Sequence, residues 1–501
     1  MKKFIYMALM AGTLTMTTSC KDFLNITPVD NLSGNNFWKS PQDVEQYTSG
    51  IYSIFREATM QQMFFPATGD LRCAPINRTS ATNGYGRNYL SYLRGNNLKA
   101  ILNQVDVDKS DYFGFKKLTQ WGTFYKMIQN ANILYYQVDN IDAGILTDTQ
   151  KKQYKAEAVF LRNLAYFFLV RLYGDVSYYT EPFHSKAIGR TPMLDVLKNA
   201  TADMEAHYKD LPWTYEDPSI VAVRAMRGAA ITLMMHMNMW SAGFSAEKNV
   251  FYERTADLGK EVMEESGTAY QLLPLARTKE IFKGRTKEGL FEIVQNFNFG
   301  ESFHLSSTFA DYVLRAPNKV TLKSYIYYDN KFMEGMYPAG VSDNRKTTWF
   351  DQYINDTQGM MQILKFVNVF MEEGEDHNPD DNQVVFRYAD PILLRAEALA
   401  ELGRDTEAQT VVNAIRTRAS AAPFTSVGDE LKDDIWWERV RELIGEGHFY
   451  YDLVRTKKVI NSKYTMAPMS VDAFNRGGWT WPIDASALAN NPYMTLNTYW
   501  N

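Results

Sequence analysis

The sequence predicts a mainly α-helical fold in which tetratricopeptide-like helical pairs form a superhelical stack, interrupted by an irregular, loop-rich insertion with short strands. Long segments carry apolar residues three and four positions apart, which is the spacing of a buried helix face. This periodicity stops between Leu272 and Asn382, where glycine, asparagine and proline recur. Two amphipathic segments joined by Gly403 also place small and bulky residues as a tetratricopeptide unit does. A stack of such pairs is the simplest architecture.

The first half of the chain is expected to form five helices. The segment Lys116 to Gln137 has one wide apolar face. The next helix is capped at Thr147-Asp148 and ends before Gly174, since glycine is the favoured residue after a helix end. Proline is favoured in the first helical turn, so a third helix is expected to begin at Thr191-Pro192. The remaining two are expected at Val221 to Ala242 and Tyr252 to Ser266.

The second half divides into an insertion and a helical end. Strand-like pieces occur at Leu290 to Gln295 and Ile363 to Phe370. Helices are expected again at 390–402, 406–420 and 429–455, followed by a coil-rich tail to Asn501. The predicted organisation is therefore a signal peptide at 1–19, an N-terminal helical region at 20–271, an irregular insertion at 272–385 and a C-terminal helical region at 386–501. Residues 20–501 are expected to form one compact unit.

The first twenty residues predict export. Met1-Lys2-Lys3 is a short positive segment, and the apolar run from Phe4 to Met16 is too short to span a bilayer. Small residues lead directly into Cys20, which resembles a bacterial lipoprotein cleavage site and makes Cys20 the expected lipidation site. The alternative is an ordinary secretory signal with an incidental cysteine. No later stretch has 18 consecutive apolar residues, so membrane attachment is expected through the lipid alone.

Composition excludes several functional classes. The 53 Lys and Arg against 58 Asp and Glu leave no basic surplus to neutralise phosphates, which argues against a nucleic-acid partner. The six histidines form no zinc-binding motif, and no glycine-rich loop cradles phosphate, so no cofactor is expected. One stretch alternates oxygen ligands as a calcium loop does, at Asp376, Asn378, Asp380 and Asn382. It lacks the usual glycine and the final glutamate, which makes it a weak calcium candidate and favours a solvated acidic loop.

Several motifs occur in an order that identifies a family resemblance. They are Trp121 to Asn132, Ala156 to Tyr166 with Leu172 to Val176, Phe386 to Ala398, Val412 to Ala419, Glu438 to Arg455, and Trp481-Pro482-Ile483-Asp484. In this order they resemble the SusD/RagB family of surface glycan-capturing lipoproteins. The resemblance implies an outer-membrane protein that faces the cell surface and lacks enzymatic activity. It would hold an oligosaccharide and pass it to a SusC-like TonB-dependent transporter.

Candidate ligand-binding residues come from the aromatic share of 14%. A sugar site needs flat rings beside amide and charged hydrogen-bonding groups, and loops can hold such rings exposed. A first mixture of this kind supplies Asp70, Arg72, Tyr85, Asn88, Tyr89 and Tyr92, and the insertion supplies Asn296, Phe299, Tyr327 and Trp349. The resemblance places Trp121 and Asp70 near the pocket. Most other aromatic residues are expected to pack the core.

Two rival functions stay open. Glu438 and Glu442 share a helix face and would serve as acid and base in an exported helical glycoside hydrolase. Structural charge pairing is the favoured interpretation for these two and for similar residues, namely Arg395, Glu397, Arg416, Arg418, Arg439 and Glu446. A tetratricopeptide-type scaffold that binds a protein and no sugar is the second rival.

Overall fold

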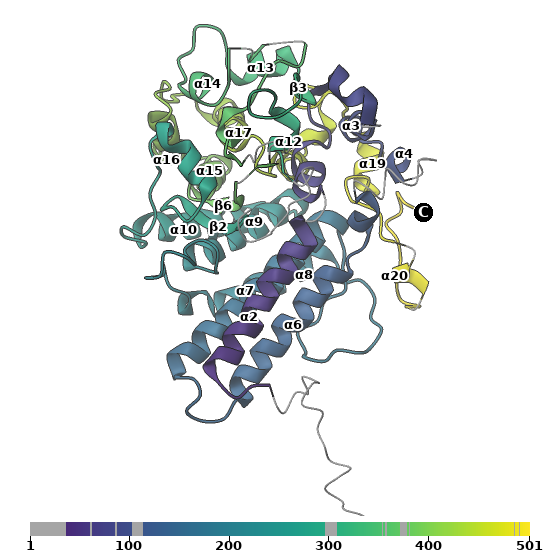
Figure 1. Ribbon diagram of the computed structural model, residues 1–501, viewed down its shortest axis with the longest axis vertical. Helices are drawn as coiled ribbons and strands as arrows, with labels where there is room; N and C mark the ends of the chain where they lie inside the picture. The colour runs from purple at the N-terminus through teal and green to yellow at the C-terminus, as the bar shows by residue number, and fades with distance from the viewer. Residues whose placement is uncertain are drawn as a thin grey trace, which may run out of the picture.

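The computed structural model describes residues 37–60, 63–85, 88–102, 114–295, 308–352, 354–355, 358–370, 378–379, 381–484, 486–489 and 491–501. Helices dominate these residues, as the sequence predicts (Figure 1). The helices of the first half are α2 (Pro41–Met60), α3 (Tyr89–Arg94), α4 (Leu98–Leu102), α6 (Gly122–Asn140), α7 (Asp148–Tyr173), α8 (Met193–Glu205), α9 (Arg227–Phe244) and α10 (Lys248–Glu264). Those of the second half are α11 (Thr278–Lys283), α12 (Ala310–Val313), α13 (Asn330–Met336), α14 (Arg345–Thr348), α15 (Ala389–Glu401), α16 (Asp405–Arg418), α17 (Gly428–Leu443), α18 (Phe449–Arg455), α19 (Val471–Asn475) and α20 (Ser486–Ala489).

Consecutive helices pack as pairs, namely α6 with α7, α9 with α10, and α15 with α16. Helix α10 also packs on α15, so two pairs far apart in sequence join in one stack. Figure 1 shows α2, α6 and α7 running side by side through the lower half of the molecule. This arrangement agrees with the predicted stack of tetratricopeptide-like pairs.

The described strands form three short antiparallel pairs in the second half and the adjoining N-terminal loop. β2 (Gly289–Ile293) pairs with β6 (Gln383–Arg387), and β4 (Val369–Phe370) pairs with β5 (Asn378–Pro379). β1 (Ile76–Arg78) pairs with β3 (Ile326–Tyr328), which ties the N-terminal loop to the insertion. The segment 363–370, expected as one strand, contains the short helix η9 (Leu364–Phe366) followed by β4.

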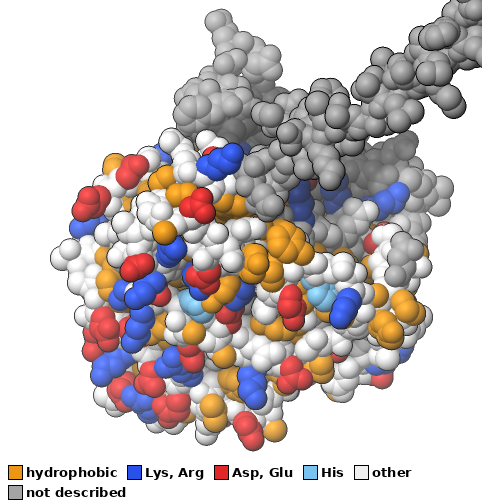
Figure 2. All heavy atoms as spheres, turned by 90° about the horizontal axis from the view of Figure 1, so that it is seen from below, with side chains coloured by type: hydrophobic (Ala, Val, Ile, Leu, Met, Phe, Trp, Pro, Cys, Tyr) orange, Lys and Arg blue, Asp and Glu red, His pale blue; other side chains and the backbone are white. Residues whose placement is uncertain are grey.

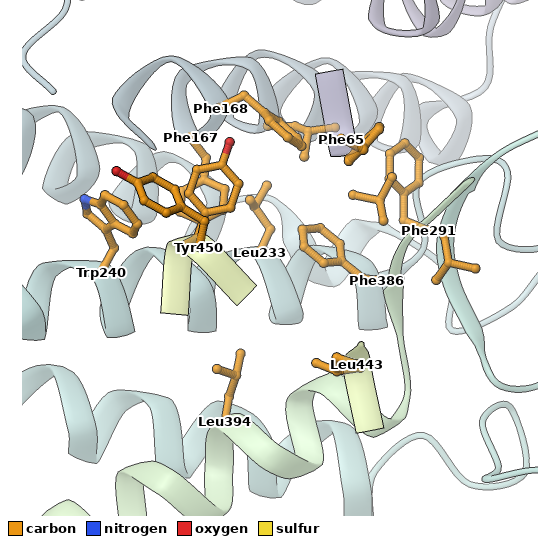
Figure 3. Close-up of a cluster of buried hydrophobic side chains, with 14 of the residues drawn as sticks. Phe65, Phe167, Phe168, Leu233, Trp240, Phe291, Phe386, Leu394, Leu443 and Tyr450 are labelled. Atoms are coloured by element: carbon orange, nitrogen blue, oxygen red, sulfur yellow. The ribbon is translucent and has the colours of Figure 1, made fainter. Parts of the chain in front are cut away.

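The core is centred on α7 and α9. Every residue of α7 from Ala156 to Tyr173 is buried, and α9 is buried from Gly228 to Ala242. Helices that are buried on all sides lie in the interior, so other elements surround these two helices. Figure 3 shows Phe167 and Phe168 of α7 facing rings from other elements, including Phe65. The rings of Phe65 and Phe168 have centroids 6.1 Å apart in an edge arrangement.

The predicted start of α7 is confirmed in detail. The backbone N–H of Gln150 donates to Thr147 Oγ1 (3.2 Å), and the backbone N–H of Thr147 donates to Gln150 Oε1 (3.0 Å). This reciprocal capping box satisfies two N–H groups that have no partner inside the helix. Gly174 ends the helix with φ of +75°, a value that glycine adopts without strain.

The structure differs from the predictions at three helical segments. Helix α2 was not predicted, although it supplies Val44, Ile51 and Phe55 to the core. Residues 221–226 form turns, and α9 therefore begins only at Arg227. The helix expected over 429–455 is divided into α17 and α18 by two glycines with positive φ.

These two glycines, Gly445 and Gly447, have φ values of +78° and +83°. A Cβ atom on Gly445 would lie 2.5 Å from the ring of Phe309. A Cβ atom on Gly69 would lie 2.4 Å from the carbonyl oxygen of Gly447, so the two backbones touch there. Close packing against other segments therefore accounts for the break between α17 and α18.

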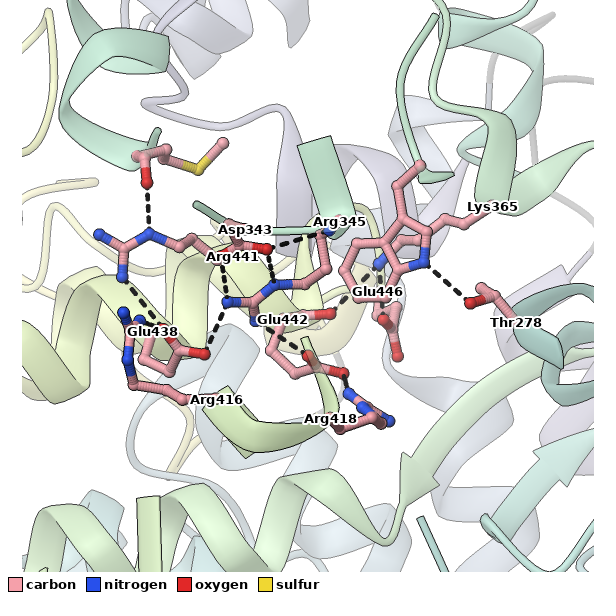
Figure 4. Close-up of polar contacts among 12 residues, drawn as sticks. Thr278, Asp343, Arg345, Lys365, Arg416, Arg418, Glu438, Arg441, Glu442 and Glu446 are labelled. Atoms are coloured by element: carbon pink, nitrogen blue, oxygen red, sulfur yellow. Dashed lines mark hydrogen bonds and ion pairs between the residues drawn. The ribbon is translucent and has the colours of Figure 1, made fainter. Parts of the chain in front are cut away.

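Helix α17 and the turn that follows it carry the glutamates of a buried ion cluster (Figure 4). We call it the α17 ion cluster and define it as Glu438, Glu442 and Glu446 with Arg345, Lys365, Arg387, Arg416, Arg418 and Arg441. Arg345 joins Glu438 (2.7 Å) to Glu442 (3.0 Å), and Arg387 joins Glu442 (2.7 Å) to Glu446 (2.7 Å). Buried charges persist only when they are paired in this way.

The predicted structural charge pairing is confirmed for all the residues named for it. Each of them has an oppositely charged partner within 4.0 Å, namely Arg395, Glu397, Arg416, Arg418, Glu438, Arg439, Glu442 and Glu446. Burial alone would raise the pKa of Glu442, but the guanidinium groups of Arg418, Arg387 and Arg345 outweigh burial and hold this pKa well below its ordinary value. The pKa values of Glu438 and Glu446 are lowered in the same way.

These lowered pKa values predict that the folded protein loses stability at acidic pH. A carboxyl group whose pKa is lower in the folded state stabilises the fold above its unfolded pKa, near 4.5. That stabilisation is lost as the pH falls toward the folded pKa, by about 1.4 kcal/mol for each unit of difference. We expect the free energy of unfolding, measured in urea, to fall steadily from about pH 5 to about pH 3. An unchanged free energy of unfolding over this range would contradict the role given to the cluster.

Candidate functional site

The pairing of β1 with β3 brings together the two segments that the sequence nominates for ligand binding. Asn77 lies directly opposite Tyr327 in this pair. Residues directly opposite each other in an antiparallel pair project from the same face, so the amide of Asn77 and the ring of Tyr327 are neighbours. Both side chains are half-buried and therefore reach the surface. A partly exposed ring and a hydrogen-bonding amide thus share one face.

Helix α3 adds a cation to this face. The guanidinium of Arg94 donates from Nη1 to Asn77 Oδ1 over 2.9 Å. Arg78, the next residue of β1, projects from the opposite face of the strand pair. It is exposed and donates to Oδ1 of exposed Asn88, the residue that precedes α3. Tyr92 lies one turn after Asn88 on α3 and is half-buried. We call Asn77, Arg78, Asn88, Tyr92, Arg94 and Tyr327 the β1–β3 surface.

The backbone under the β1–β3 surface is held by several hydrogen bonds. Thr79 donates from its backbone N–H to Tyr325 O (3.0 Å) and from its hydroxyl to Ser324 O (2.6 Å). The backbone N–H of Asp329 donates to Pro75 O over 2.8 Å. Both ends of the two-stranded pair are therefore fixed. Side chains on a fixed backbone lose little further freedom when a ligand binds.

Four of the nominated residues lie in the interior instead. Asp70, Arg72, Tyr89 and Trp349 are each at most 3% exposed. Trp349 donates from Nε1 to Thr278 Oγ1 (2.9 Å), and the ring of Tyr89 packs on Phe115 with centroids 5.2 Å apart. None of the four offers a face to a ligand in this structure, and we assign them structural roles. Their segments are rich in polar residues, but these four side chains point inward.

Arg72 illustrates this inward role. Its guanidinium donates to Asn96 Oδ1 (2.8 Å) and to the carbonyl oxygens of Gly478 (2.8 Å) and Thr480 (3.4 Å). It also lies over the ring of Tyr450, 4.4 Å from the centroid. Arg72 therefore joins the N-terminal loop to the C-terminal tail.

Asp70 is likewise used inside the molecule. Its Oδ2 accepts a hydrogen bond from the backbone N–H of Gly447 (2.9 Å). Burial raises the pKa of Asp70 well above its ordinary value, against the lowering effect of that hydrogen bond and of Lys365. The carboxyl group therefore supports the contact between the Gly69 and Gly447 backbones.

Trp121 is also a packing residue. It is 9% exposed, and its ring meets Tyr125 and Tyr173 edge-on with centroids 5.3 and 5.7 Å apart. A cavity of about 180 Å³ lies nearby, lined by residues of α2, α6 and α7 that include Glu57, Thr123 and Tyr173. Trp121 itself does not line that cavity.

Some of the remaining nominated residues lie on the β1–β3 surface, and the others are not among the residues that the structure describes. Asn88, Tyr92 and Tyr327 belong to that surface. Tyr85 ends the short helix η3 (Ser80–Tyr85), but its side chain is outside the described residues. Cys20, Asn296, Phe299, Asp376 and Asp380 also lie outside them.

The two described members of the calcium candidate do not form a ligand set. Asn378 lies on β5, and its side chain is not among those described. Asn382 is 5% exposed, and its Oδ1 accepts from the backbone N–H of Gln295 (3.0 Å). The described oxygen is thus already used within the protein, and calcium binding stays a weak prediction.

Asn77, Arg78 and Arg94 were missed by the sequence analysis. Asn77 and Arg78 belong to a three-residue strand, which is too short for a period-two pattern to reveal. Arg94 reads as an ordinary basic residue in the last turn of a helix. The only local signal is that Asn77 and Arg78 lie within the polar region that the sequence nominates and that Arg94 lies just after it.

Comparisons with known proteins decide the family. A model of the SusD family matches residues 308–500, and a model described as starch-binding associating with outer membrane matches residues 22–237. A solved SusD homologue from Bacteroides thetaiotaomicron VPI-5482 is 40% identical and superposes with a TM-score of 0.86. The match covers 93% of this chain and all of that one. The chain belongs to the SusD family.

Two more distant SusD-like proteins span the same length. SusD-like protein P38 of Formosa agariphila is 25% identical, and the match covers 99% of both chains. A laminarin-binding SusD-like protein of known structure shares the fold, with a TM-score of 0.68 at 21% identity over 92% of this chain and 99% of that one. The fold is therefore shared across strongly diverged members of the SusD family.

Within this SusD family member, one buried trio has the composition of a metal site. His236, Asp390 and His448 place one potential ligand atom each within 4.8 Å of one another. Asp390 is already occupied, because His236 Nε2 lies 2.6 Å from its Oδ2 and Arg439 donates to its Oδ1 over 2.6 Å. Burial, opposed only in part by Asp390, lowers the pKa of His448 to about 3. A hydrogen-bonded network beside a buried arginine describes the trio better than a cation site does.

The rival interpretation of this SusD family protein as a hydrolase rests on Glu438 and Glu442. A glycosidase needs one carboxylic acid that stays protonated near neutral pH. Both glutamates instead have lowered pKa values inside the α17 ion cluster. Burial does raise the pKa of Glu292 to about 7, but its Oε1 accepts from the backbone N–H of Arg285 and closes a turn before β2. Each of these three carboxyl groups thus has a structural partner.

The described part of this SusD family chain contains no helix that is long and apolar enough to cross a membrane. On the face seen in Figure 2, positive and negative side chains are interspersed, and no stripe of one sign is visible among the described residues.

Proposed function

We propose that this chain is a glycan-binding protein of the outer membrane that captures an oligosaccharide at the β1–β3 surface. The observation that carries this proposal is the convergence of Asn77, Arg94 and Tyr327 from two distant segments. A half-exposed ring offers a face for the C–H groups of a sugar, while the amide and the guanidinium bind its hydroxyl groups. The starch-binding description of the matching family model and the laminarin-binding relative support a glycan as the ligand.

In this proposal the protein binds and releases without breaking a bond. Cys20 carries a lipid that holds the chain at the membrane, and the bound oligosaccharide is passed to a SusC-like TonB-dependent transporter. Moderate affinity suits this role, since the ligand must be released after capture. Fractionation of cells that produce the chain with and without Cys20 tests the anchor, and co-purification of a transporter tests the partner.

Affinity electrophoresis through gels that contain common neutral and acidic polysaccharides tests glycan binding. Retardation by at least one polysaccharide, without new reducing ends in the incubated sample, is the expected result. New reducing ends would favour the hydrolase. Absence of retardation in every gel, with a transporter still co-purifying, would favour the tetratricopeptide-type scaffold.

Tyr327→Ala is expected to weaken binding of the retained glycan by about tenfold, or ~1.4 kcal/mol, because it removes the ring from the β1–β3 surface. Titration calorimetry with the retained oligosaccharide measures the change. Tyr136→Ala is the matched control, since Tyr136 is 45% exposed and packs edge-on against Phe183 at another site. Equal loss of affinity in both variants, or in neither, would count against the β1–β3 surface as the binding site.

A further inference from the structure

The two arginines of the β1–β3 surface are held by neutral partners. Arg94 donates to the amide oxygen of Asn77, and Arg78 donates to the amide oxygen of Asn88. An asparagine fixes the position of a guanidinium without neutralising its charge. The β1–β3 surface therefore presents two oriented positive charges.

Some arginines elsewhere in the described chain are neutralised by carboxylates, whereas others, such as Arg72 and Arg190, are held by amide and carbonyl oxygens. Arg345 pairs with Asp343, Glu438 and Glu442, and even the 40% exposed side chain of Arg254 pairs with Glu205 (2.7 Å). Among the described residues, no carboxylate forms an ion pair with Arg78 or Arg94. Arg78 and Arg94 therefore keep their positive charge at this surface without a carboxylate partner among the described residues.

The nearby carboxylate of Asp329 does not neutralise Arg78 and Arg94. Asp329 follows β3, and its Oδ1 accepts from the backbone N–H of Lys331 at the start of α13 (3.0 Å). Lys331 is itself exposed and adds a third cation close to the strand. The balance of these described groups around β1 and β3 is positive.

Each guanidinium has donors to spare. A guanidinium carries five N–H donors in a planar fork, and the asparagines use one from each arginine. The fork matches the two oxygens of a carboxylate or a sulfate in a paired geometry, and such hydrogen bonds are stronger than those to a neutral hydroxyl. The half-exposed ring of Tyr327 beside Arg94 adds a face for the sugar ring itself.

We propose that the captured glycan is acidic, with carboxylate or sulfate groups that bind Arg78 and Arg94. This inference rests on the proposed glycan-binding function and specifies the chemical class of its ligand. The charges select acidic chains over neutral ones, and Tyr327 and Asn77 contact the sugar ring and its hydroxyl groups.

Matched ligand pairs test the inference on the full chain. The first pair is an oligogalacturonate and its fully methyl-esterified form, which differ in charge on the same backbone. The second pair is a sulfated galactan oligosaccharide and its desulfated counterpart. We expect the charged member of one pair to bind at least about tenfold more tightly, by an amount that shrinks as ionic strength rises. The pair that shows this preference distinguishes carboxylate from sulfate.

Two variants assign the effect to the arginines. Arg78→Gln and Arg94→Gln are each expected to weaken binding of the acidic oligosaccharide by about tenfold, while binding of its uncharged form changes little. Arg254→Gln is the control, because it removes an arginine from a surface ion pair on α10. The thermal melts of all three variants check that the fold is intact.

The outcomes separate the inference from the function on which it rests. Equal binding of charged and uncharged members, or retention of neutral polysaccharides alone, overturns the acidic ligand and leaves glycan binding in place. Charge-dependent binding that survives both arginine substitutions overturns the assignment to this surface. Failure of every oligosaccharide, neutral or acidic, overturns both proposals.

Discussion

Replacement of Glu442 by glutamine is expected to lower the free energy of unfolding by about 3–5 kcal/mol. Glu442 is fully buried and is shared by Arg345 (3.0 Å), Arg387 (2.7 Å) and Arg418. Removal of its charge takes one carboxylate partner from three buried guanidinium groups, and a buried charge without its partner destabilises the fold. Urea unfolding at neutral pH, followed by circular dichroism, measures the loss.

Glu280→Gln is the control for this substitution. Glu280 pairs with Arg277 (2.5 Å), but both side chains are 51% exposed, so water replaces the lost partner. The melting temperature of this control should stay close to that of the unchanged protein. A Glu442→Gln protein that is as stable as the control would show that the α17 ion cluster does not hold the helices together.

Trp121→Ala is expected to cost about 3–5 kcal/mol of stability, because it opens a cavity between α6 and α7. The buried ring contacts the rings of Tyr125 and Tyr173. Glycan affinity of the folded fraction should change little, since Trp121 is not part of the β1–β3 surface. A thermal melt and a binding titration on the same sample measure the two effects.

The control for Trp121→Ala is Tyr493→Ala. It removes a ring that is 64% exposed and should leave the melting temperature unchanged. A Trp121→Ala protein that melts normally but no longer binds glycan would reverse the assignment. Trp121 would then be a sugar platform, as the family resemblance suggests.

Local sequence patterns predicted the helices because the information lies within each segment. Thr147, Gln150 and Gly174 define the ends of α7 through contacts with residues a few positions away. The same local patterns predicted one helix over 429–455, where the structure has the two helices α17 and α18. Their break depends on Gly445 and Gly447 meeting Phe309 and the Gly69 backbone, which no local pattern contains.

The candidate site was predictable only by region. The sequence nominated the polar aromatic loop and the insertion, and the structure joins them through β1 and β3. The alignment of Asn77 with Tyr327 is a long-range pairing between two three-residue strands, and such a register leaves no periodic signal. For the same reason, composition could not tell the inward rings of Tyr89 and Trp349 from the half-exposed ring of Tyr327.

The contact of Arg72 with the C-terminal tail has a consequence for the order of folding. The carbonyl oxygens of Gly478 and Thr480 accept from the buried guanidinium, and the backbone N–H of Trp481 donates to Leu172 O (2.7 Å). A ribosome makes Gly478 and Thr480, respectively, 406 and 408 positions after Arg72, so this guanidinium stays hydrated by water until the tail has been made. The interior around Arg72 is therefore completed only after the C-terminal tail has been synthesised.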